Sequence, residues 1–282
     1  MKILITGADG ALGTAMQRLL QKVGIVYLAT DIKQLDITDF KKTNEFLLNY
    51  RPTVILHFAA LSDVDRCEEE SDLALRVNAM GTLGLATIAR KIDAKMLYVS
   101  TNHVFAGSEE QPYYEYSIPK PVNQYGMTKL LGEHYVKDIC SRYYIVRTSW
   151  LFGQKSKTFM SKFIITPEKP ASIHVICDQF ASFTYTVDLA EAILTLIKTD
   201  NYGLYHLVNR EIGSWLDFAL RAKDIMKFTT SLNPITTEEL NLAASRPRYA
   251  PLGSRNYSFL FDRTMRTWKD ALVAFIASAG PQ

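Results

Sequence analysis

Short apolar blocks alternate with longer stretches of helical spacing over the first 150 residues of the chain. The blocks are rich in Ile, Val, Leu and Tyr, a composition typical of strands buried inside a sheet. They predict strands at residues 2–6, 25–29, 53–58, 96–99 and 143–147. Between them, apolar residues recur every three or four positions, which predicts helices with one buried face. In the first helix the predicted buried face consists of Leu12, Ala15, Met16, Leu19, Leu20 and Val23.

Local signals refine these elements. Thr38 stands before an apolar-periodic stretch, where a threonine is expected to cap a helix. A long helix is predicted from Ser71 through Ile92, and another begins at Tyr125. His57 lies inside an apolar strand, so we interpret it as a core histidine and not as a ligand.

The turn after the first predicted strand carries Gly7, Gly10 and Gly13, and a helix follows directly. In this context glycines let backbone N–H groups approach a pyrophosphate, and the helix N-terminus supplies partial positive charge. The second strand leads to Asp31, 18 residues beyond Gly13, where a carboxylate can accept hydrogen bonds from an adenosine ribose. A helix cap or turn aspartate is the alternative for Asp31. Lys33 nearby leaves room for a 2′-phosphate, so both NADH and NADPH stay open as cofactors.

The alternation of strands and helices predicts an α/β fold with a Rossmann-like doubly wound parallel sheet, covered on both faces. After Trp150 the pattern loosens into short strands at 172–177 and 204–208 and helices at 187–198 and 214–227. We therefore expect residues 1–150 to form the nucleotide-binding domain, with later segments, about 172–208, partly returning to it. Residues 151–282 are expected to form mainly a smaller substrate-binding lobe over the carboxyl edge of the sheet.

Composition narrows the function classes. The formal net charge of +3 is spread without a run of Lys or Arg, which argues against a nucleic-acid surface. No apolar run approaches membrane-spanning length, and no signal peptide precedes the first strand, so we expect no membrane association and a cytoplasmic protein. Cys67, Cys140 and Cys177 lie far apart without metal-ligand spacing, as incidental thiols of a reducing compartment do.

Tyr125 and Lys129 are candidates for proton transfer. They are four positions apart on a predicted helix, so both side chains point to the same side. A tyrosine has an ordinary pKa near 10, and a neighbouring ammonium group is expected to lower it toward the working range. A hydroxyl from the end of the fourth strand, Thr101 or Ser100, can hold the carbonyl oxygen that receives the proton. The alternative interpretation of Tyr125 and Lys129 is that they only form part of an amphipathic helix face. The glycine turn and Ser100-Thr101 in the same chain make this alternative less favoured.

These motifs carry a family resemblance. Gly7-x-x-Gly10-x-x-Gly13, Asn78, Ser100-Thr101 and Tyr125-x-x-x-Lys129 resemble the extended short-chain dehydrogenase/reductase family. Further segments resemble the dTDP-4-dehydrorhamnose reductase family within it, over nearly the whole chain. They are residues 59–68, 100–107, 147–153, 178–179, 184, 188–190 and 244–247. The resemblance implies NADPH- or NADH-dependent reduction of the 4-keto group of a dTDP-deoxysugar, which yields dTDP-L-rhamnose in that family. The partners it implies are a nucleotide-sugar substrate and, for the assembly, a monomer or a homodimer.

The resemblance also implies roles for individual residues. Tyr125 would donate the proton, Lys129 would bind the nicotinamide ribose, and Thr101 would complete the triad. The implied cofactor-binding residues are Gly7, Gly10, Ala11, Leu12, Gly13, Asp31, Asp36, Ile37, Ala60, Leu61, Ser62, Asn78, Tyr125 and Lys129. The implied substrate-binding residues are Thr101, Asn102, Trp150 and Arg246.

The chain departs from the family pattern at several positions. Asn102-His103 stands where the family usually has Asp-Tyr, which puts the identity of the sugar in doubt. Some relatives use a glutamate of the first helix for a magnesium-bridged dimer, and since Ala15 stands there we expect no metal. Two other functions stay open: a sugar-nucleotide epimerase or dehydratase, and a catalytically silent regulatory subunit. Dehydratases of this superfamily place Asp-Glu directly after the corresponding threonine, whereas Asn102-His103 follow Thr101 here, which counts against elimination chemistry.

Overall fold

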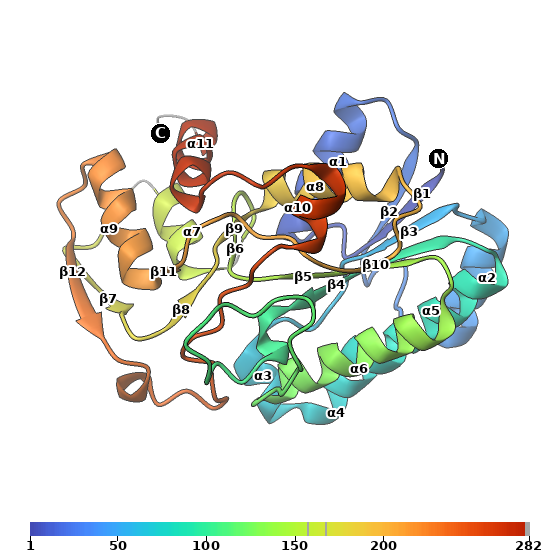
Figure 1. The fold of residues 1–282 in the computed structure, drawn as a ribbon, viewed down its shortest axis with the longest axis horizontal. Coiled ribbons are helices and arrows are strands. Elements are labelled where there is room, and N and C mark those ends of the chain that lie inside the picture. Colours follow the sequence, from blue (N-terminus) through green and yellow to red (C-terminus); the bar gives the residue numbers. More distant parts are fainter. Residues whose placement is uncertain (157, 167, 280–282) are drawn as a thin grey trace.

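A computed structural model describes residues 1–156, 158–166 and 168–279. Its centre is a six-stranded parallel sheet in the order β10-β5-β4-β3-β1-β2 (Figure 1). The strands are β1 (Ile3–Thr6), β2 (Tyr27–Thr30), β3 (Val54–His57), β4 (Lys95–Thr101), β5 (Tyr143–Thr148) and β10 (Gly203–His206). The first five confirm the predicted strands to within about two residues at each end. They are mostly apolar because both faces of the sheet are covered, with polar residues such as Thr101 and Arg147 toward the carboxyl ends.

Helices cover the two faces in separate layers (Figure 1). One layer contains α1 (Ala11–Lys22), α8 (Thr186–Ile197) and α10 (Asn256–Phe261). The other contains α2 (Phe40–Tyr50), α5 (Gly81–Lys91) and α6 (Gln124–Ile139). In α1 the predicted face is confirmed for Leu12, Met16 and Leu20, whereas Val23 is 45% exposed. Val23 lies beyond the last helical residue, so the helical period no longer directs it to the sheet.

The fold reverses direction at β1, which lies between β2 and β3. At such a topological switch the connections leave to opposite faces, and a crevice opens at the carboxyl ends of the strands. The glycine turn after β1 and the segment after β3 form the two sides of this crevice. The sheet order therefore places the predicted nucleotide-binding residues where ligands bind in doubly wound folds.

Two local predictions are corrected. The N-cap of α2 is Asp39, whose carboxylate accepts from the Lys42 N–H, because the Thr38 hydroxyl donates to Asp36 instead. The predicted helix from Ser71 to Ile92 consists of α4 (Ser71–Ala74), the π-helical segment η1 (Leu75–Met80) and α5. A π-helical turn inside an α-helix often marks a functional site. Here it contains Asn78, and the short helix α3 (Val64–Glu69) precedes it.

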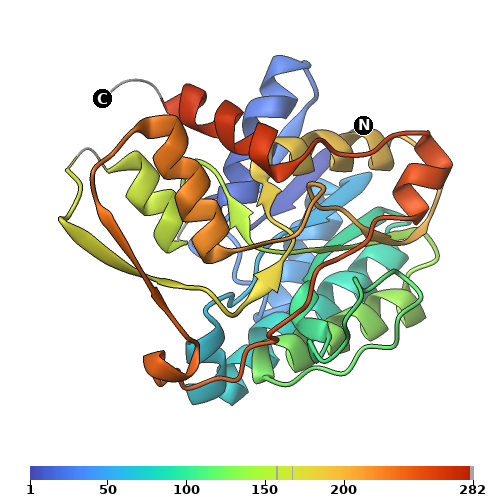
Figure 2. The ribbon, with the colours of Figure 1, turned by 60° about the vertical axis from the view of Figure 1, so that its left-hand side comes forward.

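The remaining elements form a smaller lobe beside the carboxyl end of the sheet (Figure 2). Its core is dominated by aromatic rings, among them Phe183, Phe218 and Trp268, each less than 2% exposed. The helices that contribute to this core are α7 (Phe159–Ile165), α9 (Trp215–Met226) and α11 (Trp268–Ala279). Three two-stranded sheets pair β12 (Ser231–Ile235) with β7 (Ser172–Ile176), β11 (Gly213–Ser214) with β8 (Phe180–Ala181), and β9 (Thr184–Tyr185) with β6 (Leu151–Phe152).

Two short turns complete the fold. The 3-10 turn η2 (Asn102–Val104) continues β4, and η3 (Glu238–Leu240) precedes the segment that returns to the sheet. Among the residues described, no helix combines the length and the apolarity needed to cross a bilayer. Cys67, Cys140 and Cys177 are free thiols, and the first two are buried.

Candidate active site

The glycine turn is built so tightly that two of its glycines accept no side chain. Gly7 has a φ of 68°, and a Cβ there would lie 2.6 Å from the backbone nitrogen of Ala59. A Cβ on Gly13 would lie 2.5 Å from the carbonyl oxygen of Gly7. At Gly10 a Cβ would meet one atom within 4 Å, the Gly7 carbonyl oxygen at 3.3 Å, so this position is less enclosed than the other two. Gly7 and Gly13 thus shape the turn, and Gly10 presents the surface that a ligand can approach.

The first turn of α1 has free N–H donors. Its N-cap, Gly10, makes no side-chain cap, and no acidic residue lies in its first turn. Uncapped amides at the start of a 12-residue helix fit a diphosphate, through hydrogen bonds and the helix dipole. Asp31 flanks the turn, and its carboxylate accepts from the N–H groups of Asp9 and Ile32 at 3.1 and 2.6 Å. These residues fit the dinucleotide that the sequence predicts.

The opposite wall of the crevice is the segment after β3. Asn78, completely buried in η1, accepts from the Leu61 N–H at 2.9 Å and donates to the Leu61 carbonyl at 3.0 Å. It also donates to the Thr128 hydroxyl on α6 at 3.2 Å. Asn78 therefore connects the segment containing Ala60, Leu61 and Ser62 to α6 through these hydrogen bonds, and it holds this segment in position.

The remaining adenosine-side candidates differ in exposure. Ile37 is 7% exposed and packs so closely against Gly81 that a Cβ on this glycine would touch it. Asp36 is exposed, and its carboxylate accepts hydrogen bonds from the N–H and the hydroxyl of Thr38. His57 is confirmed as a core residue, because its ring nitrogens meet the Thr6 and Thr82 hydroxyls at 2.8 and 3.0 Å.

Thr101, Tyr125 and Lys129 come together at the carboxyl end of β4. Thr101 is the last residue of the strand, and α6 begins after Asn123, whose side chain accepts from the Gly126 N–H. The Thr101 hydroxyl lies close enough to the Tyr125 phenol to lower its pKa. Lys129 is 3% exposed, and its Nζ lies 4.1 Å from the centre of the Tyr98 ring. The structure thus assembles the three predicted catalytic side chains.

Burial shifts the two titrating groups in opposite directions. It raises the pKa of Tyr125 to about 12, the Thr101 hydroxyl opposing this in part. It lowers the pKa of Lys129 to about 7, which the Glu133 carboxylate opposes. The expected depression of the tyrosine pKa is therefore wrong for the protein without ligands. Loss of solvation disfavours the phenolate more than its surroundings stabilise it.

Trp150 follows β5 closely in the chain and packs against the core of the small lobe. Its ring stacks on Trp215 with centroids 4.4 Å apart and meets Phe183 edge-on at 4.9 Å. Its φ of 40° is unusual for a bulky residue, and such backbone strain gathers at functional sites. Trp150 is thus held rigidly where the lobe adjoins the end of β5.

A strap, residues 244–250, ties the lobe to the sheet domain. Arg246 makes two hydrogen bonds of 2.6 Å to the Asp65 carboxylate and one to the Ala244 carbonyl. Asn102, 3% exposed, donates to the Ala250 carbonyl at 3.1 Å. Arg246 and Asn102, two of the four predicted substrate residues, are thus engaged within the protein.

His103 lies on the other side of the triad. Its ring meets the Tyr125 ring edge-on at 5.5 Å, and its Nδ1 lies 3.0 Å from the Asn123 amide nitrogen. Burial, together with the Arg246 charge, lowers its pKa to about 4. The imidazole is therefore neutral near pH 7 and adds no titrating group to the site there.

Sequence reasoning missed several supporting residues. Asp65 and Asn123 hold the strap, and Glu133 and Arg147 form a buried ion pair behind Lys129. Position carried a signal for two of them: Asn123 precedes a helix as an N-cap does, and Glu133 lies one turn after Lys129. Asp65 lies 181 residues before its partner Arg246, and Arg147 lies on the strand that follows the helix of Glu133, so finding these pairs needs the fold.

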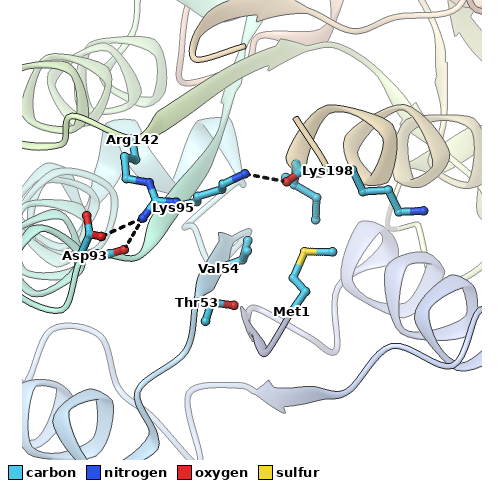
Figure 3. Close-up of a pocket in the computed structure, with 8 residues that line it drawn as sticks. Met1, Thr53, Val54, Asp93, Lys95, Arg142 and Lys198 are labelled. Carbon is cyan, nitrogen blue, oxygen red and sulfur yellow. Dashed lines mark hydrogen bonds and ion pairs between the residues drawn. The ribbon is translucent and has the colours of Figure 1, made fainter. Parts of the chain in front are cut away.

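A cavity of about 480 Å³ lies elsewhere, at the amino ends of the strands (Figure 3). Two of its basic side chains have partners: Lys95 pairs with Asp200, and Arg142 with Asp93, both within 2.9 Å. In doubly wound folds ligands bind at the carboxyl ends, so this cavity lies at the wrong end for the predicted chemistry. Within the described ranges, no group of three or more His, Cys, Asp or Glu residues could hold a metal ion.

Known proteins resemble this chain over nearly its whole length. Residues 1–280 match the family model described as the RmlD substrate binding domain. A spore coat polysaccharide biosynthesis protein, SpsK of Bacillus subtilis, is 34% identical over 98% of this chain and 96% of its own length. A crystal structure of a dTDP-4-dehydrorhamnose reductase from Clostridium acetobutylicum is 38% identical, with a TM-score of 0.94 over 99% of both chains. The dTDP-4-dehydrorhamnose reductase of Bacillus anthracis, solved in complex with NADP, is 35% identical, with a TM-score of 0.95 over 98% of this chain and 99% of its own.

Proposed function

This chain belongs to the family described as the RmlD substrate binding domain, and we propose that it reduces the 4-keto group of a dTDP-4-keto-6-deoxysugar with NADPH or NADH. The first candidate substrate is dTDP-4-dehydro-L-rhamnose, which gives dTDP-L-rhamnose. One observation carries the proposal: Thr101, Tyr125 and Lys129 converge in a fold whose glycine turn offers uncapped amides to a diphosphate. Relatives with similar sequences over nearly their whole lengths are named for this reaction.

The chain's own residues have distinct tasks in this reduction. The phenol of Tyr125 carries its proton at neutral pH, since burial raises its pKa, and it delivers that proton to the C4 oxygen of the sugar. The Thr101 hydroxyl, beside it, orients the same oxygen. Lys129 holds positive charge near the developing phenolate. When bound, the nicotinamide cofactor supplies the hydride.

Cofactor and substrate are expected on different walls. The turn from Gly7 to Gly13, with Ala11 and Leu12, receives the diphosphate, and Asp31 the adenosine ribose. On the substrate side, Trp150 offers an apolar ring held by Trp215. Arg246 reaches a second diphosphate only if it leaves Asp65, and Asn102 supports the pocket through Ala250. We assign residues 1–150, with β10 and α8, to the cofactor domain and most of residues 151–282 to substrate binding.

Two broader expectations accompany the proposal. The substrate is a nucleotide sugar, and the assembly is a monomer or a homodimer. We expect the enzyme to work in the cytoplasm, where activated sugars and reduced nicotinamide cofactors are made.

The test supplies purified protein with NADPH, or NADH, and a panel of dTDP-4-keto-6-deoxysugars. We expect loss of nicotinamide absorbance with at least one sugar, and a 4-hydroxyl product in the NMR spectrum. The variant Tyr125→Phe serves as the control for contaminating reductases. A protein that binds NADPH but consumes none with any of these sugars is a regulatory subunit, and the proposal fails.

A further inference from the structure

The Lys129 side chain is buried and surrounded by other side chains. Its ammonium group stands over the Tyr98 ring and has no hydrogen-bonded carboxylate partner among the described residues. An ammonium is strongly hydrated, so burial favours the neutral amine unless a negative charge lies nearby. The titratable and charged groups around it come from five elements: Tyr125 and Glu133 of α6, Tyr98 of β4, Cys67 of α3, His57 of β3 and Arg147 of β5.

Of these groups Glu133 is the one whose carboxylate is held in an ion pair, with Arg147. Burial lowers the pKa of His57 to about 3 and raises that of Cys67 to about 11, so both are uncharged. Glu133 lies one helical turn after Lys129, on the same side of α6. It is therefore the residue that can hold the ammonium in its charged form.

Arg147 fixes the Glu133 carboxylate in one orientation. Its Nε and Nη2 donate to the two carboxylate oxygens at 2.9 and 2.7 Å, and the two side chains are 4% and 5% exposed. The guanidinium also lies 5.1 Å from the centre of the Phe105 ring. A forked pair of this kind permits little movement of either group.

The pair is not arranged for stability alone. Arg147 is the cross-strand partner of Ser100 on β4 and of His206 on β10. In this one row Arg147 Nη1, Ser100 Oγ and His206 Nε2 are buried without a hydrogen-bond partner among the described residues. A buried ion pair contributes little net stability, and unpartnered polar atoms reduce it further. Its main effect is thus expected on the charge next to it.

We propose that Glu133 and Arg147 are positioning residues for Lys129: the carboxylate, held in place by the guanidinium, keeps the buried ammonium charged and above the Tyr98 ring. The role in catalysis rests on the proposed reductase function, whereas the effect on Lys129 does not. The sign follows from the charges. Loss of the Glu133 charge leaves burial and the positive Arg147 acting together, and both favour the neutral amine.

The decisive experiment follows the titration of Lys129 directly. The 13Cε resonance of this lysine is recorded by NMR from acid to alkaline pH in the protein without ligands, and it is assigned by its loss in Lys129→Arg. A midpoint near 7 separates it from exposed lysines, which titrate near 10.4. We expect the midpoint to fall by about one pH unit in Glu133→Gln. Asp138→Asn removes a charge from an exposed position of the same helix and should leave the midpoint unchanged.

The double variant Glu133→Gln, Arg147→Gln guards against failure to fold, since it leaves no charge unpaired. It should lower the midpoint by less than Glu133→Gln does, because the opposing Arg147 charge is also gone. The alkaline limb of kcat/KM should move to lower pH in the same order. If Glu133 and Arg147 had a purely structural role, these variants would lower the melting temperature and leave both the Lys129 midpoint and the alkaline limb of kcat/KM unchanged. A midpoint that stays at its wild-type value in either folded variant overturns the proposal, whatever reaction the protein catalyses.

Discussion

At the scale of residues, burial displaces Tyr125 and Lys129 from their ordinary pKa values in opposite directions. The phenol is harder to ionise and the ammonium easier to deprotonate, because each loses solvation of its charged form. A tyrosine that keeps its proton to high pH suits an acid, and a lysine poised near neutrality is sensitive to its neighbours. The mechanism therefore depends on local solvation as well as on the spacing of the two residues.

Tyr125→Phe tests the acid. The change removes the transferable proton and keeps the ring that packs against His103, so kcat should fall by roughly two to four orders of magnitude. Affinity for NADPH, measured by calorimetry, should change little. Tyr135→Phe makes the same change on the same helix away from Thr101 and should retain activity. Full turnover in Tyr125→Phe would exclude the assigned role.

At the scale of elements, the start of α1 joins a glycine turn to a helix N-terminus without a side-chain cap. Some helices of the protein have such a cap: Asp39 caps α2, Asn123 caps α6, and Ser214 forms a capping box with Asp217 on α9, whereas α7 and α8 begin without one. The N-terminus of α1, at Gly10, has no such cap. Directly after the glycine turn, the free amides at this end are available to an anion, which is what a diphosphate-binding turn requires.

Gly10→Val tests the turn, because the side chain would occupy the space beside the free amides. We expect NADPH binding to be lost in calorimetry, with the circular dichroism spectrum preserved. Replacements of Gly7 or Gly13 would disrupt the fold itself and are less informative. Gly84→Val is the matched control, since the nearest atom is on the exposed Phe40 ring, at 3.1 Å, and can move aside. Unchanged affinity in Gly10→Val would show that the diphosphate binds elsewhere.

At the scale of the whole molecule, the strap of residues 244–250 joins the two parts across the site. Arg246 binds Asp65, the Asn123 amide donates to the Ser245 carbonyl, and the Asn102 amide donates to the Ala250 carbonyl. A carboxylate in place of Asn102 could not donate to this carbonyl. The residue that departs from the family pattern thus joins the end of β4 to the strap, and any effect on the sugar is expected to act through that contact.

Asn102→Asp tests this link. We expect the free energy of unfolding, measured with urea at neutral pH, to fall by about 1–3 kcal/mol. The reason is that the buried carboxylate would face the Ala250 carbonyl, and both groups are hydrogen-bond acceptors. Burial should raise the pKa of the new carboxyl, so the loss should grow as pH rises through that pKa and diminish in acid, where the protonated group can donate. Asn49→Asp, exposed on α2, is the control. A neutral result would show that Asn102 does not fasten the strap, and the rates on dTDP-4-keto-6-deoxysugars would show whether it selects the substrate.

The sequence by itself determined the strands, the glycine turn and the Tyr125–Lys129 pair, because these depend on periodicity and short spacing that local geometry fixes. It also placed His57 in the core, since a residue inside a buried strand has no other place. Only the tertiary structure decided the rest. The ion pairs Asp65–Arg246 and Glu133–Arg147 join different elements, so the sequence could not show that these charges are already partnered. The pKa directions of Tyr125 and Lys129 likewise follow from burial, because several elements pack around these side chains and exclude water. This burial arises only when the chain folds.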